Sequence, residues 1–416
     1  TTETALKALG GTITPVNDTW AKTISFKNSS YNYSAGTYTI TFKVTDKAGK
    51  ETSVVRKVYK DTVAPEFGTS AITNPEASGY EETAVKPYIT TEAVNGWYNT
   101  NTLRISGGVK DAASGVKKVE YTLDTSSQNP VWHELAGTSL FSGTVPEVVN
   151  GGTIKLRATD VAGNYSDTGI SGIKIDTGMP GAVITAIDGE TTGLGNKLSN
   201  GQENIALAGT ATDALSGIEW IKITVGDKSF TDPAVTLKVT RNTQGEVTAT
   251  PFVSARDAGG NAIPGTYTWN ASIPASKITK SGTVWAQICD VAGNTTEVNL
   301  FSLQVDKEKP TVDFNSTIKE ATVNKLITIS GTANDDQKLG SIKLEYQASE
   351  KEWEDVTLDG DLDGATVSGT YNWTLTDIDS QKAFGTSIYD CDSIKPGDQV
   401  NIRVTATDAA GNERTA

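Results

Sequence analysis

Apolar and polar residues alternate in short runs along most of the chain. In residues 38–44 every second residue is Tyr, Ile, Phe or Val, and Thr or Lys lies between them. Runs of the same kind recur at 154–158, 284–288 and 400–406. A period of two places one face of a strand in a core and the other in water. No stretch shows convincing helical spacing, so the pattern predicts an all-β protein.

Each of these runs leads into the same five-residue turn. The turn reads Asp-x-Ala-Gly-Asn from Asp160, Asp290 and Asp408, and Asp-Lys-Ala-Gly-Lys from Asp46. Alternation resumes after the turn, for example in residues 301–305. Two alternating runs around a Gly-Asn turn predict a β-hairpin.

Two further strings keep their order from one turn to the next. Asp-x-x-x-Pro begins 15 or 16 residues after the first three turn Asp residues, and Gly-x-x-x-Asp follows it. The turn Asp residues are 114, 130 and 118 residues apart. A repeat of this length, built from short strands, predicts a row of β-sandwich domains. Trp20, Trp269 and Trp373 precede the turns in similar contexts and are expected to be core anchors.

The Asp-x-x-x-Pro string marks the domain boundaries, because Pro cannot lie in a central strand and stiffens a short connection. Residues 1–61 are expected to hold only the C-terminal strands of a first domain, and the last domain is expected to lack its final strand. The sequence is therefore expected to be a segment of a longer array. The predicted domains are 1–61, 62–176, 177–306 and 307–416.

Composition narrows the functions that the chain can have. Lys and Arg number 36 against 50 Asp and Glu, which gives a net charge of −14. This balance argues against nucleic acid and anionic membrane surfaces as partners. One His and two Cys in 416 residues nearly exclude His-based zinc sites and Ser-His-Asp triads. No apolar run approaches 18 residues, so no membrane-spanning segment is expected.

The repeat resembles a known family at the level of its motifs. Residues 111–124, Trp132 and the turn from Asp160 to Asn164 resemble the bacterial immunoglobulin-like repeats of large surface proteins and adhesins. The linkers 61–65 and 176–180 are similar to the joints of those arrays. The resemblance implies immunoglobulin-like sandwiches arranged end to end, secreted to the cell surface as stalks or adhesive modules. It implies no catalysis, and in some members calcium stiffens the joints.

Acidic residues are the best candidates for a site. In an immunoglobulin-type sandwich the B–C and F–G loops lie at the pole where the preceding linker enters. Three carboxylates would meet there, and Ca²⁺ takes six to eight oxygen ligands of this kind. The alternative is that each Asp only caps its own turn, while Gly supplies the positive φ. The predicted calcium sets are Asp61, Asp111 and Asp160; Asp176, Asp213 and Asp290; and Asp306, Asp335 and Asp408.

Two classes of function remain open. The first is a non-catalytic extracellular stalk or adhesin segment, whose partner is a surface protein, a glycan or neighbouring copies in a surface assembly. The second is a carbohydrate-binding accessory region of a larger secreted enzyme. Trp97 and Tyr98, between Asn95-Gly96 and Asn99, are the candidate exposed pair for ligand contact, against the alternative that they pack. The array is also expected to form an extended rod.

Overall fold

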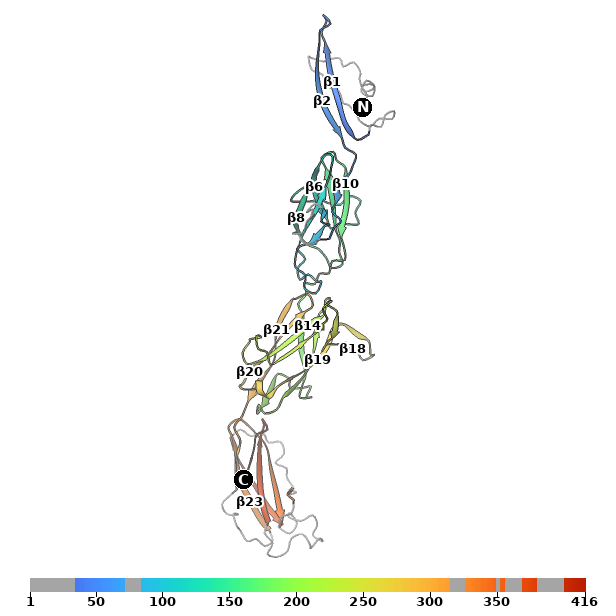
Figure 1. The fold of residues 1–416 in the computed structure, drawn as a ribbon. Helices are drawn as coiled ribbons and strands as arrows, with labels where there is room; N and C mark the ends of the chain where they lie inside the picture. The colour runs from blue at the N-terminus through green and yellow to red at the C-terminus, as the bar shows by residue number, and fades with distance from the viewer. Residues whose placement is uncertain (1–33, 72–83, 315–325, 349–351, 356–368, 380–399) are drawn as a thin grey trace. The chain divides into compact units, whose positions relative to one another are not determined.

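A computed structural model describes residues 34–71, 84–314, 326–348, 352–355, 369–379 and 400–416. These residues form β-strands joined by turns, together with the short 3-10 helix η2 (Ala275–Lys277) (Figure 1). The predicted all-β class is confirmed. By its internal contacts the chain divides into two compact units, Thr1–Thr177 and Gly178–Ala416. Each unit is described by itself below.

The first unit begins with a hairpin of β1 (Gly36–Thr45) and β2 (Glu51–Lys60). The strands pair in antiparallel register from Gly36 opposite Lys60 to Thr45 opposite Glu51. Gly49 has a φ of 82°, a left-handed conformation that favours glycine, and it closes the predicted turn. The hairpin predicted around Asp46 is therefore present.

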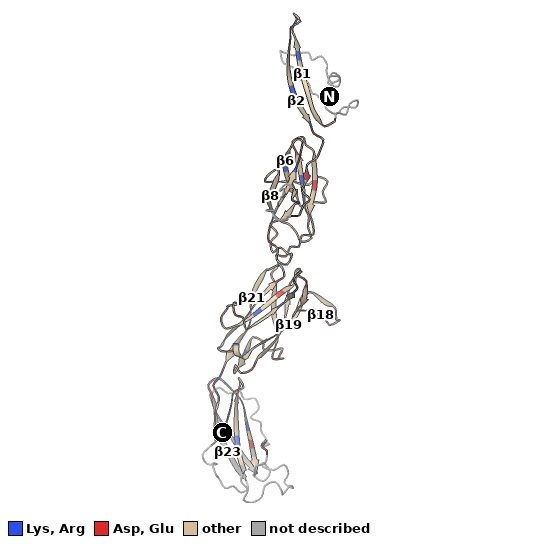
Figure 2. Ribbon diagram, in the orientation of Figure 1, with Lys and Arg blue, Asp and Glu red and all other residues tan. Residues whose placement is uncertain are grey.

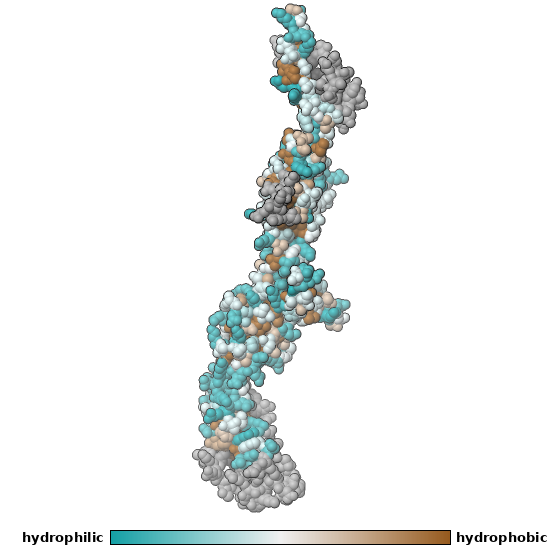
Figure 3. Space-filling model, in the orientation of Figure 1, coloured by the Kyte–Doolittle hydropathy of each residue, from teal (hydrophilic) through white to brown (hydrophobic). Residues whose placement is uncertain are grey.

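One face of this hairpin carries exposed apolar side chains near its turn. Val44 is 60% exposed and Val54 is 46% exposed. With Phe42, Thr52 and Arg56 they line a shallow hollow of about 280 Å³, and Figure 3 shows apolar residues on this hairpin. The prediction that residues 1–61 form an incomplete domain depends on residues 1–33, which lie outside the described residues.

The remainder of the first unit is a two-sheet sandwich, called sandwich A (residues 66–175). One sheet has the order β3-β5-β4, with β8 also paired to β5, and the other has the order β10-β9-β6-β7. The strands β5 and β6 flank the 111–115 loop, and β9 and β10 flank the turn that begins at Asp160. The bounds are β3 (Glu66–Phe67), β4 (Tyr88–Ile89), β5 (Leu103–Lys110), β6 (Val116–Thr122), β7 (His133–Leu135), β8 (Leu140–Val145), β9 (Ile154–Asp160) and β10 (Tyr165–Ile170).

The core of sandwich A follows from the alternation in the sequence. Ile154, Leu156 and Ala158 of β9 are fully buried, and the residues between them are partly exposed. They pack with residues of β5, β6 and β8 in one apolar cluster between the two sheets. The alternation therefore predicts correctly which face of β9 is buried.

The second unit begins with sandwich B (residues 181–305). Its sheets have the orders β11-β13-β19-β18 and β12-β21-β20-β14-β15, and a small hairpin β16-β17 is added. The bounds are β11 (Gly181–Ile187), β12 (Asn196–Ser199), β13 (Ile205–Thr212), β14 (Ile218–Val225), β15 (Val235–Lys238), β16 (Thr240–Arg241), β17 (Val247–Ala249), β18 (Val253–Arg256), β19 (Ala262–Ile273), β20 (Gly282–Asp290) and β21 (Thr295–Val305).

Sandwich C (residues 311–415) completes the second unit, and its described strands form sheets of the orders β22-β23-β26 and β25-β24-β27-β28. A cluster of its own, which includes Trp373 and Val404, fills its core. The bounds are β22 (Thr311–Phe314), β23 (Leu326–Asp335), β24 (Leu339–Ala348), β25 (Glu354–Asp355), β26 (Gly369–Asp379), β27 (Val400–Asp408) and β28 (Glu413–Thr415).

The Gly of the Gly-x-x-x-Asp string has a packing role. A Cβ on Gly209 would lie 2.2 Å from the ring of Trp269, and one on Gly331 would lie 2.2 Å from the ring of Trp373. Both rings are 1% exposed, so both Trp residues are the core anchors that were predicted. Trp20, the third predicted anchor, lies outside the described residues. The glycine thus makes room for the ring that joins the two sheets.

Charged side chains lie on the outward strand faces. Figure 2 shows basic and acidic residues interspersed along the strands. On β9 and β10, Arg157 forms a two-pronged ion pair with Asp167, with N···O distances of 2.7 and 2.8 Å. Arg157 also lies between the rings of Trp132 and Tyr165, 4.4 and 4.0 Å from their centroids. The stack gives Trp132 a place outside the core, where a planar cation covers its ring.

Candidate metal centre

The entry pole of sandwich A brings together three segments that are far apart in the sequence. The 111–115 loop and the turn that begins at Asp160 are joined by a hydrogen bond from Val161 N–H to the Gly115 carbonyl, 3.0 Å long. The linker residue Asp61 lies against both. One carboxylate oxygen from each of Asp61, Asp111 and Asp160 lies within 4.8 Å of the others. The structure therefore brings the three carboxylates of this predicted set together.

Each of the three carboxylates also accepts hydrogen bonds from backbone N–H groups. Asp160 accepts from the Asn164 N–H at 2.8 Å, and Asp111 accepts from the Gly115 N–H at 2.7 Å. Asp61 accepts from the Val63 N–H at 2.9 Å. The capping alternative is thus correct as far as it goes. It does not use every oxygen, because Oδ2 of Asp111 is buried and has no hydrogen-bond partner.

The Asn of the turn has a role that the sequence reasoning missed. The Asn164 side chain donates from Nδ2 to Asp160 Oδ2 at 2.7 Å and to the Asp61 carbonyl at 3.3 Å. Ser166 Oγ also donates to the Pro65 carbonyl at 2.6 Å. These bonds fasten the linker to the turn. The replacement of this Asn by Lys50 in the first turn was the signal that could have pointed to the role.

The entry pole of sandwich C repeats this arrangement, and all three of its Asp residues are buried. Oxygens of Asp306, Asp335 and Asp408 lie within 4.8 Å of one another, and the three residues are 5%, 3% and 3% exposed. Asn412 Nδ2 donates to the Asp306 carbonyl at 3.0 Å and to Asp408 Oδ2 at 2.7 Å. This predicted set therefore gathers as well.

Two oxygens of this second pole have no donor. Asp306 Oδ1 accepts from the Glu308 N–H at 3.1 Å, and Asp335 Oδ1 accepts from the Lys338 N–H at 2.6 Å. The Oδ2 atoms of Asp306 and Asp335 are buried and make no hydrogen bond. A buried carboxylate oxygen without a donor is costly, because it has lost water and gained nothing in return.

The pKa values of the two linker carboxylates are shifted in opposite directions. Burial raises the pKa of Asp306, and the neighbouring carboxylates of Asp408 and Asp335 raise it further. The pKa of Asp61 is instead lowered. The largest cause is the Ser114 hydroxyl, which lies beside the carboxylate but outside hydrogen-bonding geometry, and the Val63 N–H follows.

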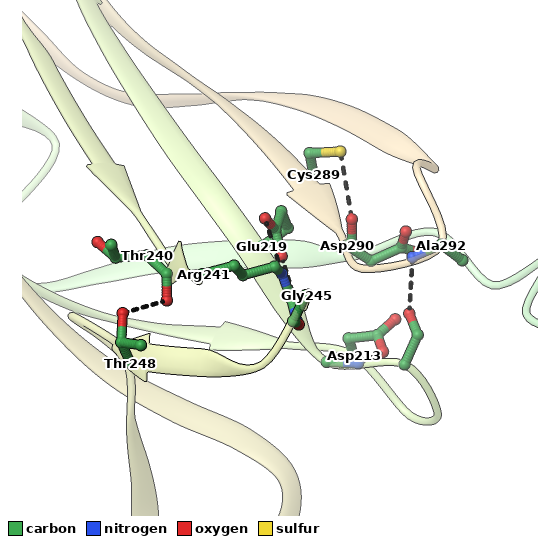
Figure 4. A network of polar contacts seen from close by, with 11 residues as sticks. Asp213, Glu219, Thr240, Arg241, Gly245, Thr248, Cys289, Asp290 and Ala292 are labelled. Carbon is green, nitrogen blue, oxygen red and sulfur yellow. Dashed lines mark hydrogen bonds and ion pairs between the residues drawn. The ribbon is translucent and has the colours of Figure 1, made fainter. Parts of the chain in front are cut away.

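The remaining predicted set is divided between the two units. Asp213 and Asp290 belong to sandwich B, where carboxylate oxygens of the two lie within 4.8 Å of each other (Figure 4). Asp213 accepts from the Gly217 N–H at 2.5 Å, and Asp290 accepts from Asn294 Nδ2 at 2.7 Å. Asp176 belongs to the first unit, so its grouping with Asp213 and Asp290 stays a prediction.

The side chains at the two described poles are ligands of the kind that a hard divalent cation takes. All of the clustered groups are carboxylates, and hard cations such as Ca²⁺ prefer oxygen ligands. No His or Cys belongs to either the Asp61 or the Asp306 set, so neither has the nitrogen or sulfur ligands that zinc usually takes. The buried oxygens without donors are the atoms that a cation would satisfy.

The candidate ligand pair Trp97 and Tyr98 packs against the last strand-like segment of sandwich A. Tyr98 exchanges backbone hydrogen bonds with Lys174 and Asp176, both 2.9 Å long. Lys174 Nζ lies 5.8 Å from the Trp97 ring centroid, and burial raises the pKa of Tyr98. Both side chains are half-buried. Their role as ligand residues stays a prediction.

The fold and the poles define a class of protein: immunoglobulin-like β-sandwiches in tandem, with carboxylates gathered where a linker enters. Residues 15–62 and 182–307, less than half of the chain, match the family model described as a bacterial Ig-like domain. The predicted resemblance to bacterial immunoglobulin-like repeats is confirmed. No curated protein matches the chain.

Solved structures that match this chain include parts of large adhesion proteins. A tetra-tandem repeat from the extending region of a large adhesion protein has 19% identity over 92% of this chain and 80% of its own, with a TM-score of 0.27. A Ca²⁺-stabilised adhesin that helps an Antarctic bacterium bind ice has 16% identity over the same shares, with a TM-score of 0.33. A 1.5-MDa bacterial ice-binding adhesin has 15% identity over 79% of this chain and 94% of its own, with a TM-score of 0.29.

In the part of the chain that the structure describes, no helix has the length and apolar character needed to cross a membrane.

Proposed function

We propose that this chain is a non-catalytic segment of a bacterial surface stalk or adhesin, whose joints are stiffened by calcium. The match to bacterial Ig-like domains supports the class of protein, and the carboxylates at the linker entries support the calcium. The observation that carries the proposal is the pair of buried oxygens without donors, on Asp306 and Asp335. The proposed domain boundaries are those of the repeat, at residues 61, 176 and 306.

The mechanism is a change in the free energy of the ordered joint. Without a cation, three close carboxylates repel one another and disfavour the arrangement in which the linker Asp meets the two loops. A Ca²⁺ ion held by Asp306, Asp335 and Asp408 would tie the linker to the loops of the following sandwich. Binding to the native state alone stabilises it by about 2.7 kcal/mol at a hundredfold excess over Kd.

In this role the chain lies outside the cell, where calcium is available. Its binding partner is a surface protein, a glycan or a neighbouring copy. The carbohydrate-binding alternative has less support, because Trp97 and Tyr98 are half-buried and engaged with the 174–176 segment. Glycan binding by the chain that is lost in Trp97→Ala would reverse this preference.

Thermal unfolding tests the calcium proposal. We expect calcium to raise the Tm relative to chelator, and Asp335→Asn to reduce this increase. Asp257→Asn is the control, because Asp257 also accepts hydrogen bonds from the backbone of its own turn and belongs to none of the acidic sets. A Tm that is the same in calcium and in chelator would leave the Asp residues as turn caps only.

A further inference from the structure

The two described joints are not equivalent. The Asp61 joint comprises Asp61, Asp111 and Asp160 with the linker 61–65, and the Asp306 joint comprises Asp306, Asp335 and Asp408 with the linker 306–310. We propose that calcium orders the Asp306 joint at a lower concentration than the Asp61 joint, so that the joints of one chain stiffen in sequence as calcium rises. This inference rests on the proposed function.

At the Asp61 joint the protein supplies its own donors to the linker carboxylate. Asp61 Oδ1 accepts from the Val63 N–H at 2.9 Å, and Asp61 Oδ2 accepts from the Ser114 N–H at 3.0 Å. The second bond joins the linker to the 111–115 loop. It holds the linker in place without a cation, and a cation that binds Asp61 Oδ2 has to share this oxygen with a hydrogen bond or displace it.

At the Asp306 joint the corresponding donor is absent from the described contacts. The N–H groups of Gln337 and Lys338 both donate to Asp335 Oδ1, within the loop itself, at 2.9 and 2.6 Å. Oδ2 of Asp306 is left buried with no partner. The cause lies in the loop, which reads Asp-Ala-Ala-Ser-Gly at 111–115 and the longer Asp-Asp-Gln-Lys-Leu-Gly at 335–340.

The charge around the two joints also disfavours the Asp306 joint when no cation is bound. Asp336 adds a fourth acidic residue, next to Asp335 in the loop, whereas the corresponding residue at the other joint is Ala112. The Asp306 joint is therefore the less favourable of the two without a cation and gains more when one binds. The difference of one hydrogen bond on the linker carboxylate corresponds to about a threefold to tenfold difference in calcium concentration.

Limited digestion with trypsin measures both joints in one full-length chain. Trypsin can cut the Lys60–Asp61 bond in one joint and the Lys307–Glu308 bond in the other, and Lys309 is protected because Pro310 follows it. We expect both bonds to be protected in calcium and not in chelator. Half-protection of Lys307–Glu308 should need a severalfold lower calcium concentration than half-protection of Lys60–Asp61. Asp335→Asn should abolish protection only at Lys307–Glu308, and Asp111→Asn only at Lys60–Asp61.

The outcomes separate this inference from the proposed function. Equal half-protection at the two bonds, the reverse order, or resistance of Lys307–Glu308 that is the same in chelator and in calcium overturns the inference. Absence of any effect of calcium at both bonds overturns the proposed function itself. Replacing residues 335–340 by Asp-Ala-Ala-Ser-Gly gives a second test, because half-protection of Lys307–Glu308 should then move up to the value of Lys60–Asp61.

Discussion

Two copies of one turn show what a local sequence can and cannot build. Asp408 and Asp257 each begin a five-residue turn that ends in Asn, and each accepts from the final Asn N–H, at 2.8 and 2.9 Å. Gly411 and Gly260 both take a positive φ, 92° and 82°. Yet Asp408 is buried among carboxylates, whereas Asp257 lies exposed at the tip between β18 and β19. The turn is local, and the candidate site around it is not.

Removing the carboxylate should have the largest effect and should separate the two turns. Asp408→Ala leaves the N–H of Ala410 and the N–H and Nδ2 of Asn412 without their acceptor at a buried position. We expect a loss of about 2–3 kcal/mol in the stability of sandwich C. Asp257→Ala should cost about 1 kcal/mol or less, because water replaces the acceptor. Hydrogen exchange of β27 and β19 measures the two losses, and equal losses would contradict the comparison.

Removing the amide of the last turn residue tests the fastening of the linker. Asn412→Ala deletes the bond from Nδ2 to the Asp306 carbonyl, 3.0 Å long, and we expect a cost of about 1 kcal/mol at the joint. Tryptic cleavage at Lys307–Glu308 should become severalfold faster. Asn261→Ala, the control, should leave this rate unchanged. Equal rates for the wild type and Asn412→Ala would show that the amide only completes its turn.

Acid should have a smaller effect than these substitutions, and in the exposed turn it should act through Asp257. Hydrogen bonds from Asn261 lower the pKa of Asp257 below its usual 3.8. A lowered pKa means that the carboxylate stabilises the turn above the usual pKa, and that this contribution is lost as the pH falls through the folded value. We expect the Asn261 amide resonance in NMR to shift only below about pH 4. Asp257→Asn should remove this titration, and a midpoint above 3.8 would contradict the assigned hydrogen bonds.

The outward-facing ion pairs provide a second pH-dependent feature. Hydrogen bonding from Arg403 holds the pKa of Glu345 at about 2, with Lys343 as a further partner. By the same sign argument this contribution is complete above the ordinary Glu pKa of 4.5 and disappears toward pH 2. Glu345→Gln should therefore destabilise sandwich C at pH 7 and make little difference near pH 2. Chemical denaturation at the two pH values measures this difference, and an unchanged gap would argue against the pair.

Particular residues show how far the sequence reasoning reached. The period of two in β9 predicts the burial of Ile154, Leu156 and Ala158, because strand geometry alone alternates the faces. The shared pole of an immunoglobulin-type sandwich predicts that Asp306, Asp335 and Asp408 meet, and they do. The stack of Arg157 between Trp132 and Tyr165 was not predicted, because it joins residues whose register is set by strand pairing.

The sequence by itself determined the strands, their turns and the repeat, because these depend on residues within a few positions of one another. It also identified the Asp residues of the three strings as those that would meet at a pole. Only the tertiary structure decided which carboxylate oxygens remain without donors. The Ser114 N–H reaches Asp61 across 53 positions of sequence, and no such donor reaches Asp306 Oδ2 in the part of the chain that the structure describes. The sequence shows that the 335–340 loop is longer than the 111–115 loop, but only the folded path of each loop past its linker decides whether a backbone N–H reaches the linker carboxylate.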